Sequence, residues 1–154
     1  IKIYIRLTQK IMQNSQKKKR LRKLEEEEKE NLFHTFQAVI NSALTEKLQD
    51  EKMAEKINTA DIRANITLQV GADEYVYTHL ILKRGDNEFE MGHLDDFDIE
   101  LTATPEDMMG FSTGELSTFQ MVTQKNEYGY KKLRVEKGGR NLGKLLLISK
   151  LLVF

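Results

Sequence analysis

The sequence predicts an α+β fold, and three observations support this prediction. Residues 31–49 carry apolar side chains at three- and four-residue spacing, which is typical of an amphipathic helix. Residues 62–70 alternate strictly between apolar and polar side chains, and further alternating segments follow up to residue 103. After one more alternating segment, an apolar helical segment ends the sequence. Strands grouped between helices in this order are typical of α+β proteins.

Length and composition limit the classes of protein to which the chain can belong. Its 154 residues, 40% of them apolar, suffice for one domain with a core and an appendage. It has no cysteine, which excludes disulfides, thiolate metal sites and cysteine nucleophiles and fits a reducing compartment. No apolar run reaches the roughly 17–25 residues that cross a bilayer. We therefore predict a soluble, cytoplasmic protein.

The first thirty residues are the most unevenly charged part of the chain. They hold ten Lys and Arg against five Asp and Glu, whereas the remainder holds fourteen against nineteen. We predict a helix over residues 1–12, where the apolar residues alternate at first and then recur at helical spacing. An acidic run, residues 25–28, comes directly after a basic run. The basic run comprises Lys17, Lys18, Lys19, Arg20, Arg22 and Lys23.

The order of the two charged runs predicts a break between two helices. One continuous helix would place each base four residues before its acid, the weaker orientation, and each run beside the wrong end of the helix dipole. We therefore predict a joint near Leu24. The basic run either contacts an anionic lipid surface or nucleic acid, or forms a solvated helix face that the adjacent glutamates neutralise. Of the macromolecular partners, an anionic membrane is favoured over nucleic acid.

The alternating segments predict a hairpin. Strands over residues 75–84 and 88–94 flank Gly85-Asp86-Asn87, which we predict as a three-residue turn. That turn would make Ile81 face Met91, and His79 face His93. Two imidazoles and Asp95 could then share a metal ion, but hydroxyl or carbonyl partners are the simpler expectation, and we predict no metal site.

The best-marked helix start follows a strand over residues 97–103, which should complete an antiparallel meander. Thr104 can cap the helix, Pro105 suits its first position, and the acids at 106 and 107 complement its positive end. This helix brings Met108, Met109 and Phe111 beside glycines. Adaptable side chains next to flexible backbone suit the flexible wall of a cavity. After Leu116, Ser117 can cap a short helix with Phe119 and Met121, and residues 130–137 predict a fifth strand.

The last helix, residues 141–154, has more apolar side chains than one stripe can hold. One set should close the core: Leu142, Leu145, Leu146, Leu152 and Val153. The other set needs a further cover: Leu147, Ile148, Leu151 and Phe154. We predict that the N-terminal segment covers this second set through Ile3, Ile5 and Leu7, with a second subunit or a ligand as the alternatives.

Catalytic patterns are weak. Residues 138–144 have the spacing of a phosphate-binding loop, but Leu145 stands where a magnesium-binding hydroxyl is needed, and too few residues follow for a further parallel strand. The cluster of Asp95, Asp96 and Asp98 fits a solvated turn better than paired acid–base catalysis. We predict no enzymatic activity and no cofactor.

The sequence resembles the sterol carrier protein type 2 family of lipid-binding domains. The matching parts are DIELTATPEDMMGFSTGEL at residues 98–116, a short Phe-bearing helix, YKKLRVEKG at 130–138 and the apolar helix NLGKLLLISKLLVF at 141–154. The resemblance covers residues 60–154 and implies a five-stranded, mainly antiparallel sheet with helices on one face, enclosing an apolar tunnel for fatty acyl chains, sterols or other lipids. We predict a charged helical extension at 1–30 and the lipid-binding domain at 31–154.

We therefore predict that the protein binds or carries a hydrophobic ligand without catalysis, as a monomer or homodimer. The alternative is a structural or interaction module whose charged N-terminal helix binds a protein, a membrane or a nucleic acid. Soft and aromatic side chains from three helices are the predicted ligand contacts. These residues are Phe36, Ile40, Met108, Met109, Phe111, Phe119 and Met121.

Overall fold

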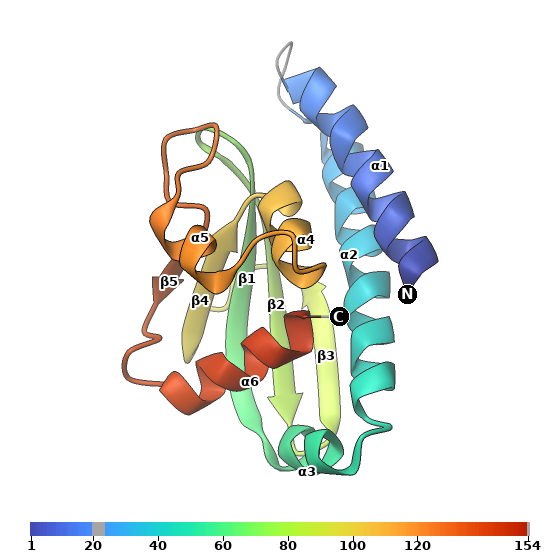
Figure 1. Ribbon diagram of the computed structural model, residues 1–154, viewed down its shortest axis with the longest axis vertical. Helices are drawn as coiled ribbons and strands as arrows, with labels where there is room; N and C mark the ends of the chain where they lie inside the picture. Colours follow the sequence, from blue (N-terminus) through green and yellow to red (C-terminus); the bar gives the residue numbers. More distant parts are fainter. Residues whose placement is uncertain (20–23, 154) are drawn as a thin grey trace.

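A computed structural model describes residues 1–19 and 24–153, with side chains described at 1–13 and 24–153. It confirms the predicted α+β class, with helices lying against one side of a five-stranded sheet (Figure 1). The helices are α1 (Lys2–Lys19), α2 (Glu26–Lys47), α3 (Glu51–Thr59), α4 (Pro105–Ser112), α5 (Thr118–Thr123) and α6 (Leu142–Leu152). The strands are β1 (Asp61–Gly71), β2 (Glu74–Lys83), β3 (Asp86–Met91), β4 (Ile99–Ala103) and β5 (Arg134–Glu136).

The order of the strands in the sheet is β3-β2-β1-β4-β5, and the pairing is antiparallel except between β1 and β4. The predicted meander is wrong, because β4 pairs in parallel with β1, with Ala64 opposite Ile99. Residues 92–98 carry the chain from β3 to the free edge of β1. The Asp98 N–H donates to the Arg63 carbonyl at 2.8 Å, and the Arg63 N–H donates to the Asp98 carboxylate at 2.9 Å. This exchange sets β4 beside β1.

The hairpin between β2 and β3 has a two-residue turn, so the predicted register is wrong. Lys83 pairs with Asp86, and the turn residues Arg84 and Gly85 have φ angles of 50° and 94°. Positive φ at both central positions is the geometry of a type I′ turn, which matches the twist of the flanking strands. His79 therefore lies opposite Glu90 and not His93. No group of side chains among the described residues is placed to hold a metal ion.

Arg84→Asn is expected to raise the free energy of unfolding by about 0.5–1 kcal/mol, because asparagine tolerates positive φ better than arginine does. Urea unfolding would measure the change. Lys83→Asn in the adjoining strand is the control and should give no gain. Equal effects of the two variants would show that the turn conformation is not the cause.

Helix starts and ends follow local signals. The predicted joint near Leu24 is confirmed, since α1 ends before it and α2 begins after it, and the Leu24 N–H donates to Glu74 Oε1 at 3.1 Å. Thr104 caps α4 by accepting from the Asp107 N–H at 3.1 Å, and Ser117 caps α5 in a capping box, as predicted. Helix α3 was not predicted, although Asp50 caps it. The fifth strand is confirmed but is shorter than predicted.

Helix α6 turns to the core a face that only partly matches the predicted one. Of the set predicted to close the core, Leu152 is buried and Leu145 packs against the core. Ile148 and Leu151 are buried, whereas Leu142 and Leu146 are 59% and 54% exposed. The Asn141 side chain donates to the Asp98 carbonyl at 2.7 Å, and Lys144 Nζ lies 3.2 Å from Asp98 Oδ2. These contacts fix the first turn of α6 to the start of β4, and the fixed rotation brings Ile148 inward.

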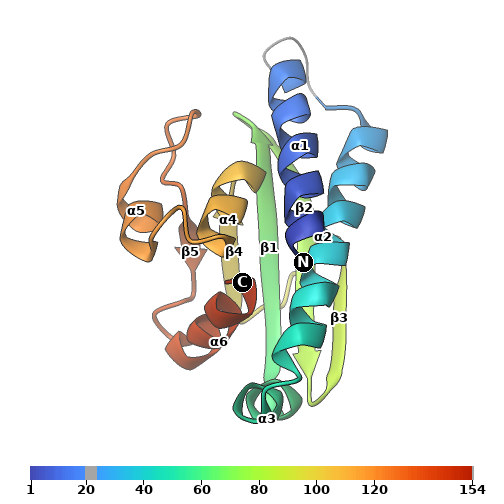
Figure 2. The ribbon, with the colours of Figure 1, turned by 45° about the vertical axis from the view of Figure 1, so that its right-hand side comes forward.

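The predicted cover of α6 by the N-terminal segment is also wrong. Helix α1 packs against α2 and α4, and α2 is the helix beside α6 (Figure 2). Ile3 and Leu7 of α1 are exposed to solvent, and only Ile5 is half-buried against the core. Phe154, the last residue of the predicted set, lies outside the described residues. The second apolar set is covered mainly by the core itself.

The sheet has one apolar and one polar face. On β1, Ala64, Ile66 and Leu68 point to the helices and are buried. The alternate residues hydrogen-bond to loops on the other face: Asn65 exchanges two bonds with the Leu94 backbone, both at 2.9 Å. An apolar interior therefore exists on the helical side, and any internal site for a hydrophobic ligand lies there.

Candidate functional site

Five of the predicted ligand contacts lie together in one buried cluster between the sheet and the helices. Helix α2 contributes two of them along its buried stripe, and α4 and α5 contribute three methionines. The five are Phe36, Ile40, Met108, Met109 and Met121. Phe111 is half-buried and packs against this cluster. Phe119 is 74% exposed on α5 and is not brought together with the others.

Phe111 also lines a surface cavity of about 540 Å³, which we call the mouth. Side chains from five helices converge on it, although they come from distant parts of the sequence. The mouth is lined by Lys47, Met53, Phe111, Thr118, Leu146, Ser149, Lys150 and Val153. Its apolar groups are continuous with the buried cluster through Phe111. Sequence reasoning predicted Phe111 but missed the rest of the lining.

Lysine side chains give the mouth a basic rim. Lys47 and Lys150 line it, and Lys56 of α3 lies beside Lys150. The Lys56 side chain lowers the pKa of Lys150, first through a hydrogen bond between the two amines and then through the repulsion of like charges. An anion bound at this rim would relieve the repulsion. An apolar cavity with a basic rim suits an amphiphile with an anionic headgroup.

Helices α1 and α4 enclose a smaller hollow of about 290 Å³, where Met12 of α1 and Met109 of α4 meet. Gly110 lines the same hollow and lies inside α4. A Cβ at Gly110 would lie 2.9 Å from Leu116 Cδ1, so glycine allows the chain after α4 to fold back closely. Helix α4 thus packs against the buried cluster on one side and against α1 on another.

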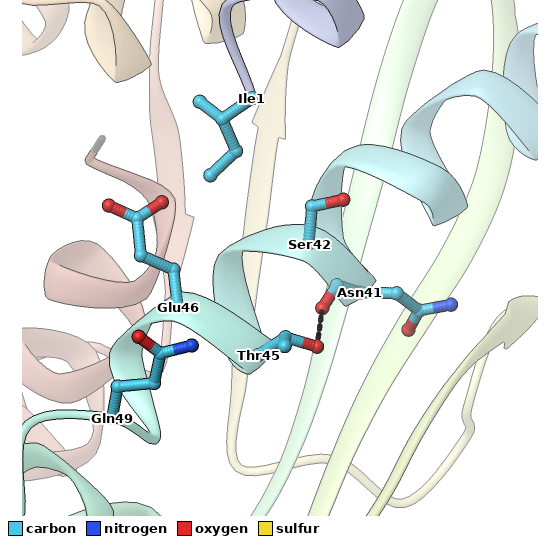
Figure 3. A pocket seen from close by; sticks show the side chains of 6 residues that line it. All are labelled: Ile1, Asn41, Ser42, Thr45, Glu46 and Gln49. Atoms are coloured by element: carbon cyan, nitrogen blue, oxygen red, sulfur yellow. Dashed lines mark hydrogen bonds between the residues drawn. The ribbon is translucent and has the colours of Figure 1, made fainter.

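A third hollow, of about 400 Å³, lies between Ile1 and the C-terminal half of α2 (Figure 3). Its lining is mostly polar, with amides, hydroxyls and the carboxylate of Glu46. The Thr45 hydroxyl donates to the Asn41 carbonyl at 2.9 Å, which is an ordinary bond within a helix. This polar lining does not suit a hydrophobic ligand.

The predicted membrane contacts fall on a part of the chain that is only partly described. Lys17, Lys18 and Lys19 belong to the last turn of α1, where the structure describes the backbone only. Arg20, Arg22 and Lys23 lie outside the described residues. Among the helices that are described, none is both long enough and apolar enough to cross a membrane.

Comparisons with known proteins bear on the fold. No protein-family model matches the sequence, and no curated protein matches it. The chain is similar in structure to apo sterol carrier protein 2 from Yarrowia lipolytica, with a TM-score of 0.53 and 23% identity over 75% of this chain and 84% of that one. It is also similar to sterol carrier protein domain 2 of Helicoverpa armigera, with a TM-score of 0.52 and 14% identity over 73% of this chain and 86% of that one.

These similarities confirm the predicted resemblance at the level of the fold. Identities of 14–23% carry no information on ligand or activity by themselves, so those depend on the residues of this chain. The chain therefore has a sterol carrier protein 2-like fold.

Proposed function

We propose that the protein binds and carries a hydrophobic or amphiphilic ligand, such as a fatty acyl chain or another lipid, in the apolar space behind the mouth. The observation that supports this most directly is the mouth itself. Its volume of about 540 Å³ lies within the range of roughly 300–1,000 Å³ that is usual for ligand pockets. Sterol carrier proteins, to which the fold is similar, are named for such ligands.

Phe111 is the residue through which a ligand in the mouth would reach the interior. It lines the mouth and packs against the buried cluster, to which Met108 and Met109 of the same helix belong. Methionine side chains are unbranched and adapt to irregular space, so they can rearrange around an acyl chain without loss of contact. A ligand longer than the mouth would enter the interior by displacing them.

The magnitudes are compatible with reversible carriage. Burial of about fourteen methylenes at ~0.8 kcal/mol each contributes roughly 11 kcal/mol of favourable free energy, before the costs of association are subtracted. Association costs roughly 4–15 kcal/mol in lost freedom and ordering. The balance allows micromolar binding, from which a carrier can still release its ligand.

Mass spectrometry of an organic extract of the purified protein tests the proposal. A co-purified lipid is the expected result, together with saturable binding of a fluorescent fatty acid. A protein that yields no lipid and also fails to bind the fluorescent fatty acid would contradict the proposal. The predicted interaction module would then be the better interpretation.

Lys150→Gln is expected to weaken binding of a fatty carboxylate about fivefold, because the basic rim loses one charge facing the headgroup. Binding of a fatty alcohol of the same length should be unchanged. Isothermal titration with the two ligands separates the charge effect from the apolar contact. Lys83→Gln on β2 removes a similar exposed charge away from the mouth and is the control. Equal losses for acid and alcohol would show that the rim does not bind the headgroup.

A further inference from the structure

Helix α1 has two apolar stripes, of which its own domain covers only one. Thr8 and Met12 are buried where α1 packs against α2 and α4, and Ile5 is half-buried beside them. The second stripe lies on the side that faces solvent, with Ile3 73% exposed and Leu7 52% exposed. We call this second set the outer stripe: Ile3, Tyr4, Leu7 and Ile11.

Basic side chains border the outer stripe. Lys2, Arg6 and Lys10 each precede a stripe residue by one position, so at four-residue spacing they run beside it along the helix. All three are exposed. The sequence of α1, Lys2–Lys19, contains no acidic residue that could neutralise them. The exposed side of α1 is therefore both apolar and cationic.

The other border of the outer stripe is a groove of about 550 Å³ between α1 and α2. Helix α2 contributes uncharged or weakly basic side chains to it, and none of the lining residues is acidic. The lining consists of Tyr4, Leu7, Ile11, Asn31, His34, Thr35 and Ala38. An anionic surface placed on the outer stripe would meet no carboxylate among these lining residues.

We propose that the outer stripe is a docking surface for an anionic lipid bilayer. Exposed apolar residues on one side of a helix, bordered by Lys and Arg, are typical of helices that lie in the plane of a membrane interface. Ile3, Leu7 and Ile11 would enter the boundary between headgroups and acyl chains, and the bases would contact lipid phosphates and carboxylates. Unlike the basic run at residues 17–23, this surface combines charge with apolar insertion.

Charge complementarity favours a bilayer over a second copy of the chain. Two copies packed through this surface would bring Lys2, Arg6 and Lys10 toward the same residues of the other copy, with no acid on α1 to offset the repulsion. The inference goes beyond the proposed function and does not depend on it, because carriage of a ligand in water needs no bilayer contact. The two are tested by different measurements.

A tryptophan reporter tests insertion, since the chain has no tryptophan of its own. In the full chain, emission from Leu7→Trp should shift to shorter wavelength with vesicles of phosphatidylcholine and phosphatidylserine, but not with phosphatidylcholine alone. Leu142→Trp, at an exposed leucine on α6, is the matched control and should not shift. No shift at position 7, equal shifts at both positions, or a shift that needs only higher protein concentration would overturn the proposal; the last result would indicate a second copy.

A charge variant tests the basic border. The triple variant Lys2→Gln, Arg6→Gln and Lys10→Gln should weaken cosedimentation with the anionic vesicles about a hundredfold. Lys52→Gln, Lys83→Gln and Lys131→Gln remove three exposed charges elsewhere and should have little effect. Equal losses in the two triple variants would indicate general charge attraction and overturn the assignment to α1. Titration of the variants with the fluorescent fatty acid reports separately on ligand binding.

Discussion

Met109→Asp is expected to lower the free energy of unfolding by about 4–5 kcal/mol, a large fraction of the stability of a single domain. Met109 is only 2% exposed and lies in the buried cluster between α4 and the sheet. A carboxylate there would lose its hydration among apolar side chains, and it would also leave the space of the longer methionine unfilled. Urea unfolding followed by circular dichroism measures the loss, and failure to fold at room temperature is its extreme form.

Phe119→Asp is the matched control for this prediction. Phe119 is 74% exposed on α5, which follows α4 along the chain, so the same new carboxylate would remain in water. Its effect should stay within about 0.5 kcal/mol. If the two variants had similar stabilities, the wall formed by α4 would not be packed as described.

Leu146→Asp is expected to weaken binding of a fluorescent fatty acid by at least about tenfold, while the protein stays folded. Leu146 lines the mouth but is 54% exposed, so a charge there costs little when no ligand is bound. A bound acyl chain would lose its apolar contact with the leucine, and its binding would strip the new carboxylate of its hydration. A fluorescence titration gives the affinity, and the melting temperature confirms that the fold is retained.

Leu142→Asp makes the same change one turn earlier on α6, at a leucine that is 59% exposed and does not line the mouth. It should leave the affinity for the fatty acid unchanged. Equal loss of affinity in both variants would mean that a negative charge anywhere on α6 repels the ligand. No loss in either would place the ligand elsewhere.

The sequence predicts best those features that depend on neighbouring residues. Thr104 with Pro105 marks the start of α4, and Ser117 marks the start of α5, because capping needs only a side chain and the next turn of backbone. The buried stripe of α2 is predicted for the same reason, since its period shows which side turns inward. The same logic would have found α3 from Asp50, but the nine-residue helix has too short a pattern to stand out.

The errors lie where the structure depends on distant residues or on an uncommon backbone. Arginine rarely adopts positive φ, so Gly85-Asp86-Asn87 is the natural prediction for a turn that the chain makes at Arg84 and Gly85. A one-residue change in the turn moves every pair along β2 and β3. The pairing of β4 depends on β1, whose paired residues lie 35 positions earlier, and no local pattern in β4 identifies this partner.

Of the candidate site, the sequence predicts the buried residues but not the lining of the mouth. Spacing along α2 and the position of α4 identify the buried Phe36 and Met109, although their role as ligand contacts stays a prediction. The mouth forms only when α2, α3, α4, α5 and α6 come together, and its lining depends on the rotation of α6 about its axis. That rotation is fixed by contacts of Asn141 and Lys144 with Asp98, which connect segments about forty residues apart.

Helix α1, which carries the outer stripe, contacts both α2 and α4, so a route exists by which the outer stripe and the α4 wall could affect each other. Met12 and Met109 share one hollow, so any shift of α1 changes what the α4 wall packs against. Binding equilibria connected in this way are reciprocal: the factor by which a bilayer changes the affinity for a ligand is also the factor by which the ligand changes the affinity for the bilayer. Loaded and empty molecules would then partition differently between bilayer and water, so the fraction of protein on the bilayer would depend on how much of it carries ligand.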